Sequence, residues 1–115
     1  MVDFFDEPQD IDYVIVKTKL KTVCERGSIY EATRYAWVVS GMRIQKYEYV
    51  LGVIDGIVRG VYHVDEWREI KSGRDIGRYE FLGTDAPYEI AEIFLNKRLP
   101  PKYCTGSANP VLYKK

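Results

Sequence analysis

Residues 49–67, YVLGVIDGIVRGVYHVDEW, consist of two runs of β-branched and aromatic residues joined by Asp55-Gly56. Asp-Gly between apolar runs is the strongest short-range signal for a β-hairpin, because a type I′ turn needs positive φ at both central positions. The sequence therefore predicts paired antiparallel strands at 48–54 and 57–66. Both faces of the first run are apolar, so that strand needs cover on both sides.

The other elements are predicted from periodicity, capping residues and turn residues. A first strand at 12–18 leads into a polar loop that ends at Gly27, and the hairpin leads into a charged loop at 68–77. Short helices, a strand, a longer helix and a closing strand follow from the patterns at 29–36, 40–46, 78–82, 86–96 and 111–113. This order describes one α+β domain around a strongly curled or closed antiparallel sheet.

The apolar positions of these elements predict the core. Strong burial is expected for eight residues: Val53, Ile54, Val61, Trp67, Phe81, Ile90, Ile93 and Phe94. The helix at 86–96 is expected to pack across one end of the sheet. Residues 1–12 are predicted to be a loosely ordered acidic arm, whose Phe4 and Phe5 could dock on the domain at 13–115.

Formal charge is zero, from 17 basic and 17 acidic residues, which argues against an indiscriminate nucleic-acid binder. The charge is nevertheless segregated along the chain. Residues 13–46 carry seven bases and two acids, residues 47–96 ten acids and five bases, and residues 97–115 five bases and no acid. If the segment 17–46 and the C-terminal tail meet in space, they form a basic face opposite an acidic one; the alternative is that these blocks only solvate the surface.

Cys24 and Cys104 are separated by 80 positions, without a CxxC pattern or a neighbouring histidine, so neither a metal site nor a cofactor is predicted. No apolar run approaches the ~18 residues of a membrane span, and no signal-peptide pattern opens the chain. We expect a cytoplasmic protein with two free thiols and no membrane partner.

His63 is the only histidine, and it shares a strand face with Val61 and Asp65. An imidazole near a carboxylate could act as a general base, although a lone histidine in a sheet is usually structural. Asp65 and Glu66 are strand neighbours that point to opposite faces, so they do not form a catalytic carboxylate pair. No catalytic residue is assigned.

The best functional candidate is the segment 30–37, YEATRYAW, with Glu31, Arg34 and Trp37 beside the basic stretch. Aromatic rings stack on exposed bases, arginine binds phosphate, and a carboxylate accepts a hydrogen bond from a base amine. The alternative is that Trp37 and Tyr30 are core residues and that Glu31 belongs to a helix cap.

Arg78 and Asn109 complete the predicted nucleic-acid-binding site. The asparagine amide offers the donor and acceptor that reading a base edge requires, and it precedes the final strand, which in a closed barrel returns beside the first strand. We therefore predict that Arg34, Trp37 and Asn109 approach one another around a cleft. The alternative is that Asn109 ties the tail to the helix.

Several motifs occur in an order that resembles a family of microbial domains without an assigned activity. They are 30–34 with Trp37, 49–53 leading through 55–58 to Gly60, Val61 and Trp67, then 78–81, and finally 106–111 with Tyr113. Members of that family occur alone or attached behind GIY-YIG nuclease domains. The resemblance covers roughly residues 13–114 of this chain.

More distantly, the central hairpin is similar to that of the PUA-like superfamily, which includes the EVE and ASCH families. This resemblance implies a pseudobarrel, a small curled antiparallel β-barrel with flanking helices. Several members bind RNA or modified bases between barrel and helix, which implies RNA or single-stranded or modified DNA as the partner here. Two alternatives stay open: a protein-interaction accessory domain of a nuclease system, and an enzyme that processes nucleic acid.

Overall fold

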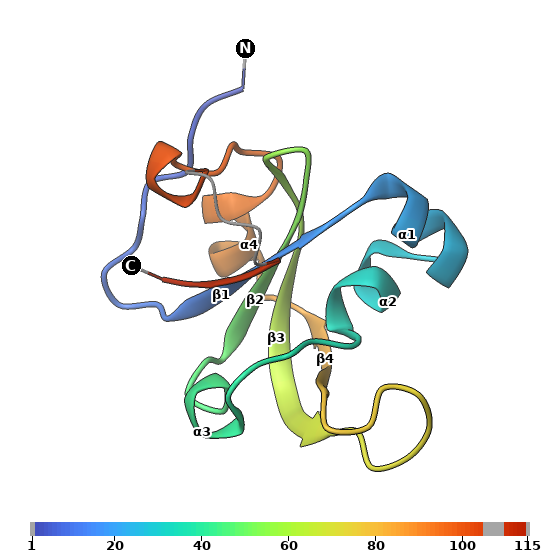
Figure 1. The fold of residues 1–115 in the computed structure, drawn as a ribbon. Coiled ribbons are helices and arrows are strands. Elements are labelled where there is room, and N and C mark those ends of the chain that lie inside the picture. Colours follow the sequence, from blue (N-terminus) through green and yellow to red (C-terminus); the bar gives the residue numbers. More distant parts are fainter. Residues whose placement is uncertain (1, 105–109, 115) are drawn as a thin grey trace.

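A computed structural model describes residues 2–104 and 110–114. Within them the chain is an α+β domain with one five-stranded sheet between helices (Figure 1). The strands are β1 (Tyr13–Thr18), β2 (Tyr49–Ile54), β3 (Ile57–Glu69), β4 (Tyr79–Asp85) and β5 (Val111–Tyr113). The helices are α1 (Leu20–Arg26), α2 (Ile29–Arg34), α3 (Gly41–Ile44), α4 (Tyr88–Phe94) and the 3-10 helix η1 (Pro101–Tyr103). The predicted α+β class is confirmed.

The central hairpin forms as predicted. Asp55 and Gly56 take φ values of 52° and 77°, which turn the chain between β2 and β3. The two strands pair antiparallel from Tyr49 with His63 down to the turn, with an irregularity after Gly52. The Asp-Gly dipeptide thus sets the register of the two pairs beside the turn, and the irregularity shifts the pairing by one residue from Gly52 onward.

The sheet is mixed, so the prediction of an antiparallel sheet is wrong for one strand pair. The strand order is β4-β3-β2-β1-β5, and β1 runs parallel to β2. A parallel pair needs a crossover of a dozen or more residues, and the segment 19–48 with α1, α2 and α3 provides it. Among the described residues no pairing joins β4 to β5, and a closed barrel is not observed.

Each face of the sheet carries its own hydrophobic core, because alternate residues of a strand point to opposite faces. Tyr13 and Ile15 of β1 join Phe94 of α4 in one core, while Val14 and Val16 join the core beneath α2 and α3. In Figure 1 α4 and η1 lie on one side of the strands and α1 and α2 on the other. The expectation of cover on both faces is confirmed.

Half of the predicted core is strongly buried. The buried residues are Val53, Val61, Phe81 and Phe94. The residues that are only half-buried are Ile54, Trp67, Ile90 and Ile93. Ile54 and Trp67 each line a hollow of the surface, which explains why an apolar pattern overstated their burial.

The N-terminal arm docks on the core that contains α4. Phe5 is 3% exposed, and its ring lies edge-on to Tyr13 and Phe94 with centroid distances of 5.9 and 4.9 Å. The Phe5 amide donates to the carbonyl of Arg98 at 3.1 Å. Phe4 stays on the surface, so the docking that the sequence left open is made by Phe5.

Glu7 ties the arm to the far end of the chain. The hydroxyls of Tyr13 and Tyr103 donate to its Oε1 at 2.8 and 2.7 Å, and Lys102 Nζ lies 2.6 Å from its Oε2. Burial raises the pKa of Glu7, but these hydrogen bonds outweigh it and hold the pKa below its ordinary value. The ionised carboxylate of Glu7 therefore joins the N-terminal arm to β1 and to η1 near the end of the chain.

Candidate functional site

Arg34 ends α2 and is held by two carboxylates. Its Nε lies 2.8 Å from Oε1 of Glu31, and a terminal nitrogen donates to Oε1 of Glu80 in β4 at 2.5 Å. Arg68 of β3 binds the other oxygen of Glu80 at 3.2 Å. Burial lowers the pKa of Arg34, yet the bonds to both carboxylates raise it above the ordinary value. With 20% of its side chain exposed, Arg34 joins helix to sheet rather than facing solvent.

Trp37 lies beside the start of β4 and is held by hydrogen bonds from both its backbone and its side chain. Its amide and carbonyl exchange hydrogen bonds of 2.8 Å with Tyr79, and its indole Nε1 donates to the Thr33 carbonyl at 2.7 Å. The ring packs against the core beneath α2. Its polar atom is already satisfied, which favours the alternative in which Trp37 is a core residue.

The predicted site residues are thus only partly brought together. Glu31 and Arg34 are in direct contact, and Trp37 lies just beyond them in the chain. Arg78 is exposed on the loop before β4, where its carbonyl accepts from the amide of Ile70 at 2.8 Å. Asn109 lies outside the described residues, so its approach to the other residues stays a prediction.

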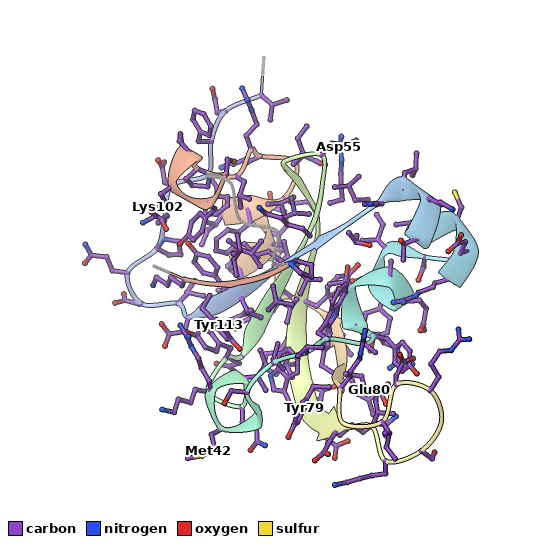
Figure 2. The ribbon with its side chains drawn as sticks, in the orientation of Figure 1. Met42, Asp55, Tyr79, Glu80, Lys102 and Tyr113 are labelled. Carbon is purple, nitrogen blue, oxygen red and sulfur yellow. The ribbon has the colours of Figure 1, made fainter. Side chains whose placement is uncertain are left out.

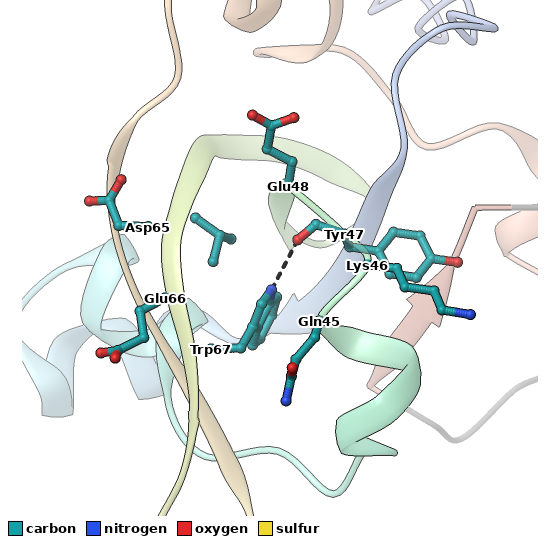
Figure 3. Close-up of a pocket in the computed structure, with 8 residues that line it drawn as sticks. Gln45, Lys46, Tyr47, Glu48, Asp65, Glu66 and Trp67 are labelled. Atoms are coloured by element: carbon teal, nitrogen blue, oxygen red, sulfur yellow. Dashed lines mark hydrogen bonds between the residues drawn. The ribbon is translucent and has the colours of Figure 1, made fainter.

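A pocket of about 280 Å³ lies elsewhere, between the segment that enters β2 and the second half of β3 (Figure 3). The register between β3 and β4 shifts between Val64 and Glu66, and such bulges re-aim the side chains next to them. The pocket is lined by Gln45, Lys46, Tyr47, Glu48, Val64, Asp65, Glu66 and Trp67.

Trp67 forms a fixed aromatic wall of this pocket. Its Nε1 donates to the Tyr47 carbonyl at 3.0 Å, and its ring lies edge-on to Phe81 with centroids 5.2 Å apart. Figure 3 shows Trp67 beside Gln45, with Glu48 across the hollow. Trp67 is half-buried, as Trp37 is, but unlike the Trp37 ring described above it lines this pocket, so part of the residue is accessible from the hollow.

His63 orients the carboxylate at the rim. Its Nε2 lies 2.9 Å from Oε1 of Glu48, and its Nδ1 lies 3.3 Å from Oδ1 of Asp65. The Tyr49 ring packs edge-on to the imidazole with centroids 5.5 Å apart. Within the described part of the chain, no group of three or more histidine, cysteine or acidic side chains could hold a metal ion.

Arg43, Tyr47 and Tyr113 form a surface, here called the basic aromatic ledge, which adjoins the pocket through Tyr47. The Arg43 guanidinium lies 3.8 Å from the centre of the Tyr113 ring, and the rings of Tyr47 and Tyr113 are 5.1 Å apart. Burial raises the pKa of Tyr113, and the charge of Arg43 offsets this only in part. Cation and ring therefore support each other at the edge strand β5 (Figure 2 labels Tyr113).

Sequence reasoning missed this pocket, although one signal for it existed. The two-residue turn at Asp55-Gly56 alone would place Glu48 against His63, and the irregularity after Gly52 moves it on by one residue, so that the amide of Val64 donates to the Glu48 carbonyl at 2.8 Å. The segments 45–48 and 64–67 therefore had to lie side by side. The register shift between Val64 and Glu66, close to Trp67, is indicated by no local pattern.

Comparisons with known proteins add no assignment. Neither a family model, nor a curated protein, nor a solved structure matches this chain. No described helix has the length and apolar character needed to cross a membrane. Cys24 and Cys104 are free and exposed.

Proposed function

We propose that this chain is a binding module for single-stranded nucleic acid and that one base enters the pocket beside Trp67. The observation that carries the proposal is the half-exposed indole of Trp67, fixed by Tyr47, with the side chains of Gln45 and Glu48 around the same hollow. Stacking of a base on such a ring contributes roughly 1–3 kcal/mol and tolerates any base.

The polar groups of the pocket suit the edge of a base. The Gln45 amide offers both a donor and an acceptor, while the Glu48 carboxylate accepts from an exocyclic amine. About 280 Å³ is just below the range of roughly 300–1,000 Å³ that is typical of small-molecule pockets, so one base fits better than a larger ligand.

The charges around the pocket predict where the sugar-phosphate backbone runs. Glu48, Asp65 and Glu66 outnumber Lys46 among the lining residues, giving a formal charge of one minus three, or −2, that repels phosphate. Lys46 and Arg43 lie on the side of the basic aromatic ledge. The strand is therefore expected to cross that ledge, with its phosphates beside these two cations.

The test is fluorescence anisotropy of labelled single-stranded RNA and DNA 12-mers, with a duplex as comparison, at 25 and 150 mM salt. We expect the double variant Gln45→Ala/Glu48→Ala to weaken binding about tenfold or more. Lys46→Ala should lower the salt slope by about one without changing base preference. Glu89→Ala, at an exposed position of α4, is the matched control and should leave binding unchanged.

Two outcomes would contradict the proposal. One is that the parent protein binds no single strand of either kind at 25 mM salt. The other is that the Gln45→Ala/Glu48→Ala variant, with an unchanged circular dichroism spectrum, binds as tightly as the parent. In the second case binding resides elsewhere, and the segment around Arg34 and Arg78 becomes the surface to probe.

We also propose that the chain is related to the PUA-like superfamily. In its support, α2 packs against β1, β2, β3 and β4 together, and the strand pairings shift register after Gly52 and after Val64, as bulges that curl a sheet do. Under this proposal the chain is a cytoplasmic domain of the family found alone or attached behind GIY-YIG nuclease domains, and its partner is RNA or single-stranded or modified DNA.

A further inference from the structure

Helix α1 leaves its apolar residues uncovered. None of its residues is buried, Leu20 is 64% exposed, and Val23 is only half-buried. A helix of seven residues is marginal without a packed face, because most helical stability in proteins comes from burial of an apolar stripe. Within the described residues α2 contacts α1, yet Leu20 remains mostly exposed beside it.

The uncovered side of α1 opens onto an apolar hollow of about 420 Å³. It is lined by Leu20, Val23, Ile29, Ile54, Asp55, Ile57 and Arg59. Ile54 and Ile57 face each other across the tip of the hairpin, and both are half-buried. Five of these seven side chains are aliphatic, a composition typical of a surface that another chain covers.

The charge beside the hollow is positive. The segment 19–26 carries Lys19, Lys21 and Arg26 against the single acid Glu25, which gives three minus one, or +2. At the hairpin tip, the charges of Asp55 and Arg59 cancel. An occupant with acidic residues around an apolar stripe would complement both features.

We propose that this hollow binds an amphipathic segment of a partner protein, with aliphatic or aromatic side chains flanked by Asp and Glu. The chain's own acidic arm does not serve, since Phe5 is in the opposite core and Glu7 is bound by Tyr13. The base pocket proposed above uses residues 45–48 and 64–67, so this surface is separate from it and does not depend on it.

The experiment is display selection of random 12-residue peptides on the immobilised full chain, with counter-selection on Leu20→Asp. Leu20 is 64% exposed, so this variant should fold normally, which its melting curve checks. We expect enriched peptides with a net negative charge and at least two large apolar residues. A synthesised winner should bind tenfold or more weakly to Leu20→Asp and several-fold more weakly to Lys21→Glu.

The matched control is Tyr88→Ala, which removes another exposed apolar side chain, 78% accessible and on α4. It should leave peptide affinity unchanged. The proposal is overturned if selection enriches no peptide, if enriched peptides are neutral or basic, or if Leu20→Asp binds them equally well. Concentration-dependent dimerisation of the parent that Leu20→Asp abolishes would also overturn it, because the occupant would then be a second copy.

Discussion

Gly52 of β2 lies so close to α2 that an alanine does not fit. A Cβ at position 52 would lie 2.5 Å from Oγ1 and 3.4 Å from Cγ2 of Thr33. Thr33 is fully buried, and its hydroxyl donates to the Ile29 carbonyl at 2.7 Å, so its side chain has nowhere to turn. We therefore expect Gly52→Ala to destabilise the protein by forcing helix and sheet apart.

The size of the effect follows from two opposing contributions. Overpacking in a core costs typically about 1–3 kcal/mol. Alanine in a strand interior gains roughly 0.5–1 kcal/mol over glycine. Subtracting the two ranges leaves a net loss between about 0 and 2.5 kcal/mol for Gly52→Ala, centred near about 1 kcal/mol. In a Thr33→Ala background the clashing atoms are gone, so the same substitution should be neutral or should stabilise by up to about 1 kcal/mol.

Urea unfolding of the four proteins of this cycle, followed by tryptophan fluorescence, measures both quantities. Midpoints should shift while the slope with denaturant stays constant, as expected when the native fold is kept. The reasoning is refuted if Gly52→Ala is at least as stable as the parent. It is also refuted if the cost is the same with and without Thr33, because α2 would then not rest on β2 at this point.

Two further predictions concern charges paired between remote segments. Glu7→Gln should lower the melting temperature at neutral pH and make it depend less on pH in acid. A carboxylate with a lowered pKa stabilises the fold above its ordinary pKa of about 4.3, and this stabilisation is lost as the pH falls through the lowered pKa. Melting temperatures of variant and parent from pH 3 to 7 check the prediction, and parallel profiles would contradict it. Arg34→Ala should lower the melting temperature by several degrees, because the nearly buried Glu80 loses one of its two arginine partners. Glu31→Ala should change the melting temperature little, because 44% of the Glu31 side chain is exposed. Equal melting temperatures for the two variants would contradict the prediction.

The parts of the fold that were predictable are those with local causes. The turn at Asp55-Gly56 needs two residues that tolerate positive φ, and no distant contact is required to choose it. The start of α2 is equally local, because the Ser28 hydroxyl accepts from the Glu31 amide at 3.1 Å, as the capping pattern indicated. Such features follow directly from residue types at fixed spacing.

Other features depend on contacts between remote segments. The parallel pairing of β1 with β2 depends on the path of the crossover, which residue patterns at 12–18 do not encode. Helix α1 was interpreted as a polar loop, because a helix with no buried face has no apolar periodicity to detect. The role of Arg34 likewise depends on Glu80, 46 positions away, so its neighbours in sequence indicated a solvent-facing cation.

The charge segregation of the sequence acquires a specific meaning in the fold. The basic stretch and the C-terminal tail do meet, at Lys17 with Pro110 and at Arg43 with Tyr113. Within the described residues Arg34 forms ion pairs with Glu31 and Glu80. The other bases of the stretch form one basic area on α1 and another at α3. The area at α3 adjoins a pocket with an aromatic wall and polar groups, where the proposal above places an unpaired base. The area on α1 adjoins an aliphatic hollow with few polar groups, where a base would lose its hydrogen bonds and an amphipathic peptide would keep its own. The two basic areas carry charge of the same sign but are expected to bind different ligands, because the hollow beside each area determines which groups can leave water there.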